Sequence, residues 1–399
     1  MTLEAGFAAA MRDRAPGPVA VALSGGGDSM ALLHLAHGAG LNPIAITVDH
    51  GLRDVDAELA LCARACADLG LRHEVLRWTW DGSGNLQAEA RAARRRLIGD
   101  RARALGLRSV LLGHTRDDQA ETVLLRIARG SGVDGLAGMA LASGTDPVWL
   151  RPLLDVPRAE LRDWLRARGI GWAEDPSNSD PRFDRVRARS LMAELAPLGL
   201  SPERLVRLAD HAAAARRVLT CVAAERAADV TQDRGDLRIP AELLDLSDDT
   251  SRRIVSAAVQ WVAGAPYRPP WEALTAALAS ARTRPATLAG CLLSPDAGGV
   301  RIAREPGATQ GPVPAGDTWD GRWHLSPPEG AETEGLHIAR LGEAVAQCTD
   351  WRGTGLPRAS LMASPAVWDD CDLVAAPLAD FGNWRARIVA DFTGFLESR

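Results

Sequence analysis

Short apolar runs alternate with stretches of helical periodicity through residues 1–150. The apolar runs predict strands at 19–23, 43–48, 73–78, 109–113 and 148–150. Apolar positions that recur every three or four residues predict helices between these strands, at 29–36, 55–69, 86–105 and 117–128. Strands that alternate with helices form parallel sheets with right-handed crossovers, so we predict an α/β fold with a doubly wound parallel sheet.

The pattern changes after residue 157, where most segments show helical periodicity and arginine is frequent. Helices are predicted up to about residue 217, with a long alanine-rich one at 205–229, and then at 249–262 and 271–281. An alternating strand at 300–304 is followed by a linker rich in glycine and proline at 306–314. The predicted domains are a sheet domain with a helical extension at 1–216, a helical middle domain at 217–305 and a small α+β domain at 315–399.

The composition is that of an ordinary globular protein, with 46% hydrophobic and 24% charged residues. No apolar run reaches the length of a transmembrane helix, and the N-terminus lacks the apolar core of a signal peptide. The six cysteines are scattered and include no CxxC pair, which argues against a zinc ribbon, an iron–sulfur site or a disulfide framework. We therefore expect a cytoplasmic protein that makes no contact with a membrane.

The first predicted strand runs directly into Ser24, Gly25, Gly26, Gly27, Asp28 and Ser29. Glycines let the backbone approach a ligand, and the N–H groups of such a turn bind anions together with the helix N-terminus behind it. An acid at this position repels a phosphate unless a cation lies between them, so the loop predicts phosphate and Mg²⁺, with Asp28 as a metal ligand. The chain contains no lysine, which excludes the common phosphate loop that depends on one. A tight turn without a ligand is the structural alternative.

The segment after the fourth predicted strand contains His114, Asp117 and Glu121. Asp117 and Glu121 are four residues apart in a predicted helix, so their carboxylates lie on one face and repel each other. Two acids held together at the carboxyl end of a strand suggest a partner cation, either Mg²⁺ or a substrate ammonium group. A solvated acidic face is the alternative. Thr115 and Asp118 match a capping box, which leaves Asp118 open between a cap and a ligand.

Two groups of arginines are candidates for binding phosphates. Arg91 and Arg94 share one face of a predicted arginine-rich helix. The second group follows a polar break at 174–181 and consists of Arg182, Arg185, Arg187 and Arg189, for which RNA backbone phosphates are the plausible target. The alternatives are a solvated basic face for the first group, and pairing with Asp180 and Asp184 for the second. The formal net charge of -5 does not by itself favour a nucleic-acid ligand.

Several of these strings, taken together and in order, resemble the tRNA(Ile)-lysidine synthetases, a family of PP-loop ATP pyrophosphatases. The more specific strings are VDHGLR at 48–53, GHTRDDQAET at 113–122, RGSG at 129–132 and GLAGM at 135–139. SGGGDS at 24–29 marks the wider superfamily, and the helix at 85–94, RPLL at 151–154 and the segment 174–187 complete the match. The resemblance is strong over about half of the chain.

The resemblance implies a two-step reaction on tRNA(Ile) with a CAU anticodon. ATP, with Mg²⁺, adenylates the C2 oxygen of the wobble cytidine, and free L-lysine then attacks C2 to give lysidine, AMP and pyrophosphate. The domain at 1–216 would bind ATP and carry out catalysis, and the domain at 315–399 would contact tRNA. The family also makes a homodimer plausible for this chain.

The resemblance also suggests roles for the candidate residues. The loop at 24–29 would hold pyrophosphate, with Asp28 and Asp117 as ligands of Mg²⁺, and Arg91 would neutralise phosphate charge or steer the base. Asp117 and Glu121 would bind the lysine ammonium group or Mg²⁺, and one of Asp117, Glu121 and His114 would act as the base. Arg182, Arg185 and Arg187 would contact phosphates of the anticodon stem.

The chain departs from the family pattern in two places. Arg95 stands where the arginine-rich helix usually has tyrosine, and the C-terminal segment lacks the expected basic string. Two other functional classes stay open at this point. One is a different PP-loop enzyme, either a tRNA thiolase, against which the missing CxxC counts, or a small-molecule amidotransferase or ligase. The other is a tRNA-binding protein without catalytic activity.

Overall fold

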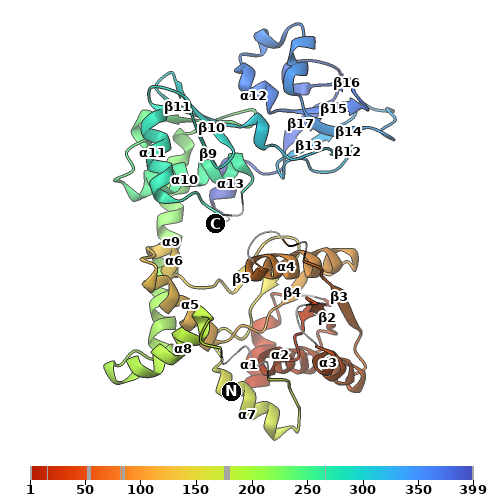
Figure 1. Cartoon of the computed structure of the whole chain (residues 1–399), viewed down its shortest axis with the longest axis vertical. Coiled ribbons are helices and arrows are strands. Elements are labelled where there is room, and N and C mark those ends of the chain that lie inside the picture. Colours follow the sequence, from red (N-terminus) through yellow and green to blue (C-terminus); the bar gives the residue numbers. More distant parts are fainter. Residues whose placement is uncertain are drawn as a thin grey trace. The chain divides into compact units, whose positions relative to one another are not determined.

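The computed structural model describes residues 2–15, 17–51, 55–80, 82, 86–174, 180–265 and 267–397. The chain divides into two compact units, Met1–Arg216 and Arg217–Arg399 (Figure 1). Parts of three strings quoted above lie outside the described residues, namely Leu52 with Arg53, Asn85, and residues 175–179. Within the described ranges, no helix is long and apolar enough to cross a membrane.

A six-stranded sheet forms the centre of the first unit, in the order β3-β2-β1-β4-β6-β5. Its strands are β1 (Ala20–Ala22), β2 (Ile44–Asp49), β3 (His73–Arg77), β4 (Ser109–Leu111), β5 (Ala142–Ser143) and β6 (Val148–Leu150). All neighbouring strands are parallel except β5 and β6, which are antiparallel. The predicted doubly wound parallel sheet is therefore confirmed, and each predicted strand is present. The two-residue edge strand β5 was not predicted.

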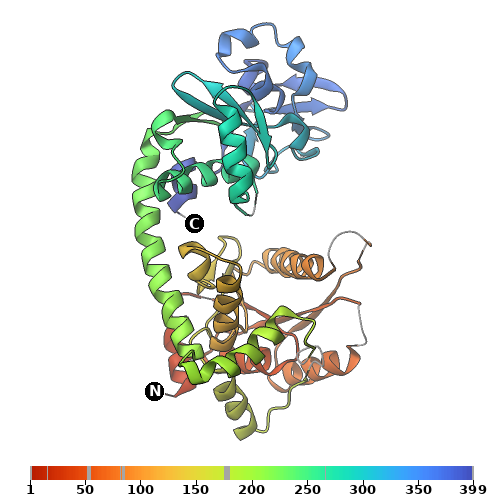
Figure 2. The same ribbon diagram turned by 60° about the vertical axis from the view of Figure 1, so that its left-hand side comes forward.

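Helices pack on both faces of this sheet (Figure 2). They are α1 (Leu3–Met11), α2 (Gly27–Gly38), α3 (Asp56–Asp68), α4 (Leu86–Ala104), α5 (Arg116–Ala128), α6 (Val133–Leu136), α7 (Arg158–Ala167), α8 (Asp184–Leu195) and α9 (Pro202–Arg226), the last continuing into the second unit. Val21 of β1 lies in a core with Met30 of α2 and Leu161 of α7, whereas Ala20 lies in a separate core with Ile98 of α4. Successive side chains of a strand point to opposite faces, so β1 must be apolar at every position.

The second unit contains two antiparallel sheets and a two-stranded ribbon. The first sheet has the order β7-β8-β11-β10-β9, with β7 (Thr231–Asp233), β8 (Asp236–Pro240), β9 (Ala286–Leu288), β10 (Cys291–Asp296) and β11 (Gly299–Arg304). The second has the order β12-β14-β15-β16, with β12 (Val313–Pro314), β14 (His337–Arg340), β15 (Pro365–Asp369) and β16 (Asp372–Ala375). The ribbon pairs β13 (Trp323–Ser326) with β17 (Arg385–Ile388).

The helices of the second unit include both of those predicted for residues 217–305. They are α10 (Asp249–Ala263), α11 (Trp271–Ala281), α12 (Arg358–Met362) and α13 (Phe392–Glu397). Short 3-10 turns occur at Ala196–Leu198, Ala227–Asp229, Ala241–Leu243, Pro306–Ala308, Gly342–Gln347, Trp351–Thr354 and Pro377–Ala379. The region 217–305 thus contains the predicted helices and also four strands that were not predicted, β7 to β10.

Buried polar contacts join the segment after residue 311 to the sheet before it. Asp236 of β8 accepts hydrogen bonds from Nη1 of Arg301 at 2.8 Å and from Oγ of Ser360, in α12, at 2.6 Å. The side chain of Arg322 donates to the carbonyl oxygen of Val262 at 3.0 Å and lies with its Cζ 4.3 Å from the ring centroid of Trp261. The two segments for which separate domains were predicted therefore share one compact unit.

Candidate active site

The loop between β1 and α2 has the geometry of an anion site. Gly25 has φ +80°, a conformation that favours glycine, and Gly26 is the N-cap of α2 without a side-chain cap. The first N–H groups of the helix have no partner within the helix, so they are the natural donors to an anion. The backbone N–H of Ser24 donates to Oγ of Ser29 at 3.2 Å, and that hydroxyl donates to the carbonyl oxygen of Gly26 at 2.9 Å. These contacts fix the shape of the loop.

The end of β4 lies directly against this loop. A Cβ atom on Gly113 would lie 3.1 Å from the carbonyl carbon and oxygen of Asp28 and 3.2 Å from the amide nitrogen of Ser29. Only a glycine permits this approach without displacement of the backbone. The strand that leads to His114 and α5 is therefore packed against the start of α2, as expected for the carboxyl ends of neighbouring parallel strands.

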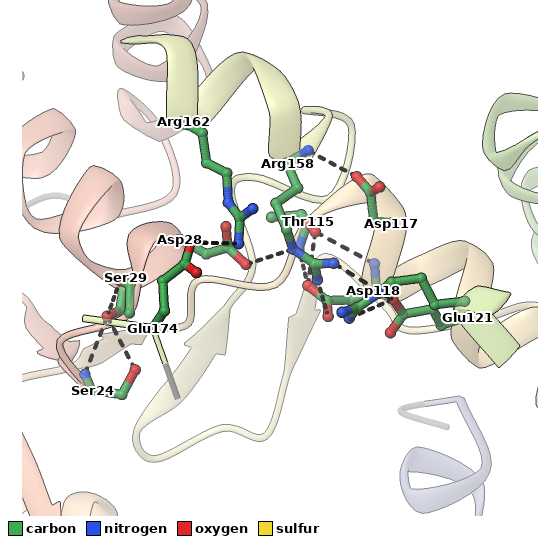
Figure 3. A network of polar contacts seen from close by, with 12 residues as sticks. Ser24, Asp28, Ser29, Thr115, Asp117, Asp118, Glu121, Arg158, Arg162 and Glu174 are labelled. Atoms are coloured by element: carbon green, nitrogen blue, oxygen red, sulfur yellow. Dashed lines mark hydrogen bonds and ion pairs between the residues drawn. The ribbon is translucent and has the colours of Figure 1, made fainter. Parts of the chain in front are cut away.

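Arg158, the first residue of α7, connects the loop to the acids of α5 (Figure 3). Its Nε lies 3.1 Å from Oδ2 of Asp28, and its Nη2 lies 2.8 Å from Oδ1 of Asp118. Its Nη1 lies 3.5 Å from Oε1 of Glu121. The Arg158 side chain is 15% exposed, so these ion pairs are shielded from water. One guanidinium group thus contacts three carboxylates on two elements, α2 and α5.

The carboxylate of Asp117 contacts the backbone at the start of α7. Its Oδ2 accepts the backbone N–H of Arg158 at 2.8 Å, so this carboxylate caps the start of α7. Pro157, the N-cap residue of α7, provides no side-chain cap of its own. Asp117 and Glu121 both lie close to Arg158, but one binds its backbone and the other its guanidinium group. Whether either binds a substrate ammonium group or Mg²⁺ stays a prediction.

Asp118 serves both as a cap and as an ion-pair partner. Its Oδ2 accepts hydrogen bonds from the backbone N–H and the hydroxyl of Thr115, each at 2.8 Å, which completes a capping box at the start of α5. Its other oxygen pairs with Arg158. Burial alone would raise the pKa of Asp118, but the charge of Arg158 and the bonds from Thr115 outweigh it and lower the pKa. Asp118 is therefore ionised at neutral pH.

Glu121 is fully buried and is the acid best suited to accept a proton. Its Oε1 accepts a hydrogen bond from Nε of Arg189, in α8, at 2.9 Å, and it lies 2.9 Å from Nη2 of the same residue. Its Oε2 has no hydrogen-bond partner among the described residues. Burial raises the pKa of Glu121, although the charge of Arg189 opposes the effect. A carboxylate with a raised pKa and a free oxygen can act as a base on a donor in the site.

His114 lies in a more positive environment. Burial, together with the charges of Arg151, Arg185 and Arg91, lowers the pKa of His114 to about 4 despite the opposing charge of Asp118. The imidazole is therefore neutral at physiological pH. Its Nδ1 is buried without a partner in the described part of the chain.

The arginines of helix α4 have different surroundings. Arg94 contacts Nε2 of His50 through Nη2 at 2.7 Å, whereas Arg91 contributes positive charge near His114. Arg95, which replaces the tyrosine of the family pattern, lies with its Cζ 4.5 Å from the ring centroid of Trp149. A cation–π contact thus takes the place of an aromatic side chain.

The three arginines predicted to contact the anticodon stem lie in different environments. Arg182 pairs with Asp180 at 2.6 Å, and Arg187 pairs with Asp184, the intramolecular alternative considered above. Both arginines are largely exposed, and exposed pairs contribute little energy and exchange partners readily. Arg185 instead lies close enough to His114 to lower its pKa.

Sequence reasoning missed Arg158 and Arg151 as site residues, and it assigned Arg189 to the RNA-binding arginine cluster rather than to a contact with Glu121. Arg151 is 9% exposed, donates to the carbonyl oxygen of Ala140 at 2.8 Å, and leaves its Nε buried without a partner among the described residues. The available signal was the string RPLL followed by Arg158 at the start of a helix. That signal gives no indication of which acids the arginine pairs with.

The described residues fit Mg²⁺ only as a companion of a nucleotide. They contain no group of three or more metal-binding side chains. Mg²⁺ bound to phosphates needs only one or two carboxylates from the protein, because phosphate oxygens and water complete its coordination. Asp28, beside the loop, can provide one such carboxylate.

Comparison with known proteins identifies the class first. Residues 1–195 match a family model described as the PP-loop domain. The first unit is therefore an ATP-binding domain of the PP-loop type.

The family follows from full-length relatives. A tRNA(Ile)-lysidine synthase of Ruegeria pomeroyi is 46% identical over 396 residues, covering 96% of this chain and 94% of that protein. One of Mesorhizobium japonicum is 36% identical, covering 94% of this chain and 88% of its own length. One of Rhodopseudomonas palustris is 49% identical over 212 residues, covering 50% of this chain and 61% of its own. The chain belongs to the tRNA(Ile)-lysidine synthase family, a family of ligases, as its sequence motifs predicted.

Proposed function

We propose that the chain joins free L-lysine to C2 of the wobble cytidine in the CAU anticodon of tRNA(Ile), at the expense of ATP. The observation that carries this proposal is the contact of Arg158 with both the phosphate-type loop and the acids of α5. This contact supports the proposal because it joins the loop proposed for the nucleotide to the acids proposed for a cationic substrate. Family membership supports the same conclusion.

In the first step, the C2 oxygen of cytidine attacks the α-phosphorus of ATP, and the bond to the β-phosphate oxygen breaks. The amides at the start of α2 would hold the departing pyrophosphate, and the hydroxyls of Ser24 and Ser29, which contact each other at 3.1 Å, would turn towards it when it binds. Asp28, with Asp117 as the second predicted ligand, would hold Mg²⁺, which neutralises phosphate charge when bound. Arg91 is a candidate for contacting the phosphates or the base.

In the second step, the ε-amino group of lysine attacks C2, and AMP leaves. Lysine enters as an ammonium ion, so a proton must be removed before the attack. Glu121 is the best candidate for the base, because its pKa is raised by burial and its Oε2 has no partner in the described part of the chain. His114, with a pKa of about 4, is a weaker base and is neutral at physiological pH. Its Nδ1 is available for a hydrogen bond to the substrate.

The tRNA must present its target base out of the anticodon stack, which costs little in a single-stranded loop. Arg185 is the best placed of the three predicted arginines to bind a phosphate near the reacting base, because its charge acts on His114. Arg182 and Arg187 would exchange their exposed acidic partners for RNA phosphates. We expect Arg185→Ala and Arg187→Ala to weaken tRNA binding and to make its salt dependence shallower.

The decisive experiment incubates the purified protein with tRNA(Ile), ATP and labelled lysine, and measures lysidine in the tRNA. AMP release that depends on lysine is the expected result. AMP release without dependence on lysine would favour another PP-loop enzyme, and no release at all would favour a binding protein.

The phosphate loop is tested separately with Asp28→Ala, which should abolish pyrophosphate release while tRNA still binds. Asp163→Ala removes an exposed carboxylate that is 73% accessible and serves as the matched control. Normal turnover by Asp28→Ala would show that the loop has been assigned wrongly. The homodimer and the cytoplasmic location are further proposals, which light scattering and cell fractionation test directly.

A further inference from the structure

Arg158 contacts both of the sites that the proposed reaction needs. Its Nε faces Asp28, beside the loop for ATP, at 3.1 Å. Its two terminal nitrogens face Asp118 at 2.8 Å and Glu121 at 3.5 Å, at the site for the lysine ammonium group. In the absence of substrates, Arg158 therefore pairs with the carboxylates that the two substrates are proposed to need.

The backbone of Arg158 is held in place, whereas the ion pairs of its side chain differ in length. Asp117 holds its N–H at 2.8 Å, so the side chain moves about an anchored point. The contact with Glu121, at 3.5 Å, is the longest of the three ion pairs. This contact is the first to be lost if the guanidinium group shifts towards the loop.

The acids keep room for one further cation. Four carboxylates, those of Asp28, Asp117, Asp118 and Glu121, lie around Arg158, and Arg189 and Arg162 add further positive charge to this network. The Oε2 atom of Glu121 is buried and has no partner among the described residues. A buried acceptor without a donor is costly and points to a missing N–H group, such as that of an ammonium ion.

We propose that Arg158 couples the binding of the two substrates, so that ATP at the loop strengthens the binding of lysine at α5. ATP phosphates bind guanidinium groups bidentately and compete with Asp28 for Arg158. As Arg158 turns towards the phosphates, its contact with Glu121 is lost and the acid becomes available to lysine. The order of binding then matches the order of the chemical steps. This inference rests on the proposed function.

The test is a calorimetric titration of the full chain with L-lysine, with and without α,β-methylene-ATP and Mg²⁺. Couplings between sites are typically 5- to 150-fold, and we expect the analogue to lower the Kd for lysine about tenfold. By reciprocity, lysine should lower the Kd for the analogue by the same factor. If Arg158 had a purely structural role, its substitution would change stability and leave the ratio of the two Kd values for lysine unchanged.

Two variants at this position and one control complete the design. Arg158→Gln should bind lysine with the same Kd whether or not the analogue is present. Arg158→Lys keeps the charge but cannot bridge three carboxylates, so its gain should fall below about threefold; it decides the question if the glutamine variant does not fold. Arg166→Gln, two turns further along α7 and 61% exposed, should keep the full gain.

The outcomes separate the inference from the function on which it rests. A tenfold gain that persists in both Arg158 variants overturns the coupling role. So does equal affinity of the unchanged chain for lysine with and without the analogue. Failure of the unchanged chain to bind lysine under either condition counts against the proposed function itself.

Discussion

Gly113 allows a direct test of how tightly β4 packs against the ATP loop. In Gly113→Ala the new methyl group would lie 3.1 Å from the carbonyl carbon and oxygen of Asp28. Ordinary carbon contacts lie at about 3.5–4.0 Å, so the backbone of α2 or β4 must shift by a few tenths of an ångström. The displaced atoms belong to the residue beside the phosphate site. We therefore expect the substitution to impair both stability and ATP binding.

The magnitude follows from two opposing terms. Insertion of a methyl group into a packed region costs about 1–3 kcal/mol, and replacement of glycine by alanine recovers about 0.4–1 kcal/mol through the unfolded state. The net loss is about 1–2 kcal/mol, which corresponds to a fall in Tm of about 2–8 °C for a domain of this size. The same displacement should raise the KM for ATP about three- to tenfold.

The assay combines thermal unfolding with initial rates of pyrophosphate release over a range of ATP concentrations. Gly38→Ala is the matched control, because Gly38 is the last residue of α2 and a Cβ there meets no atom within 4 Å. It should leave the KM unchanged and should not lower the Tm. A Gly113→Ala protein with the Tm and KM of the unchanged chain would refute the close approach of β4 to the loop.

Three further predictions concern pH, the second unit and the cysteines. Because the pKa of His114 falls to about 4, the unfolded chain binds one proton more than the folded chain between about pH 4 and 6.5. The free energy of unfolding should therefore fall by up to about 3 kcal/mol as the pH is lowered through this window, as measured by urea titration. This loss should be smaller in His114→Gln. An equal loss in the variant would contradict this. Asp236→Ala removes the acceptor of the buried Arg301 and should cost about 3 kcal/mol, seen as a lower Tm, whereas an unchanged Tm would show that the network is dispensable. Mass spectrometry after brief iodoacetamide treatment at pH 7 should find the exposed thiols labelled and the buried ones, with their raised pKa values, protected; uniform labelling would contradict the burial. The exposed thiols are Cys221 and Cys371, and the buried ones are Cys62, Cys66, Cys291 and Cys348.

The sheet of the first unit could be predicted because its strands are buried on both faces. Ala20 and Val21 are each 0% exposed and contribute to different cores, so no polar residue interrupts the run. The carboxyl ends of such strands meet at one edge, which is why Asp28, His114 and Glu121 could be expected in one site. The strand boundaries shifted by only one or two residues.

Four strands of the middle region, β7 to β10, could not be recognised for the opposite reason. In β8, the charged residue Asp236 is buried and pairs with the buried Arg301 of β11, so the apolar pattern of β8 is broken within the core. Pro240 and Pro295 lie within β8 and β10, where a proline argues against a strand. The partner of Asp236 lies 65 positions away in the chain, so the local sequence pattern cannot reveal this pairing.

The acids of the site show both the reach and the limit of sequence reasoning. Like charges at one strand end do require a cation, and this inference from Asp117 and Glu121 was sound in principle. Cations of the chain itself, however, already contact these acids: Arg189 lies 2.9 Å from Glu121, and Arg158, 130 positions after Asp28, folds back onto that residue. Spacing within a helix can reveal a surplus of charge, but only the fold reveals how much of it remains for a ligand. Here Arg158 and Arg189 both contact Oε1 of Glu121, and its Oε2 has no partner among the described residues, which leaves that oxygen for a ligand.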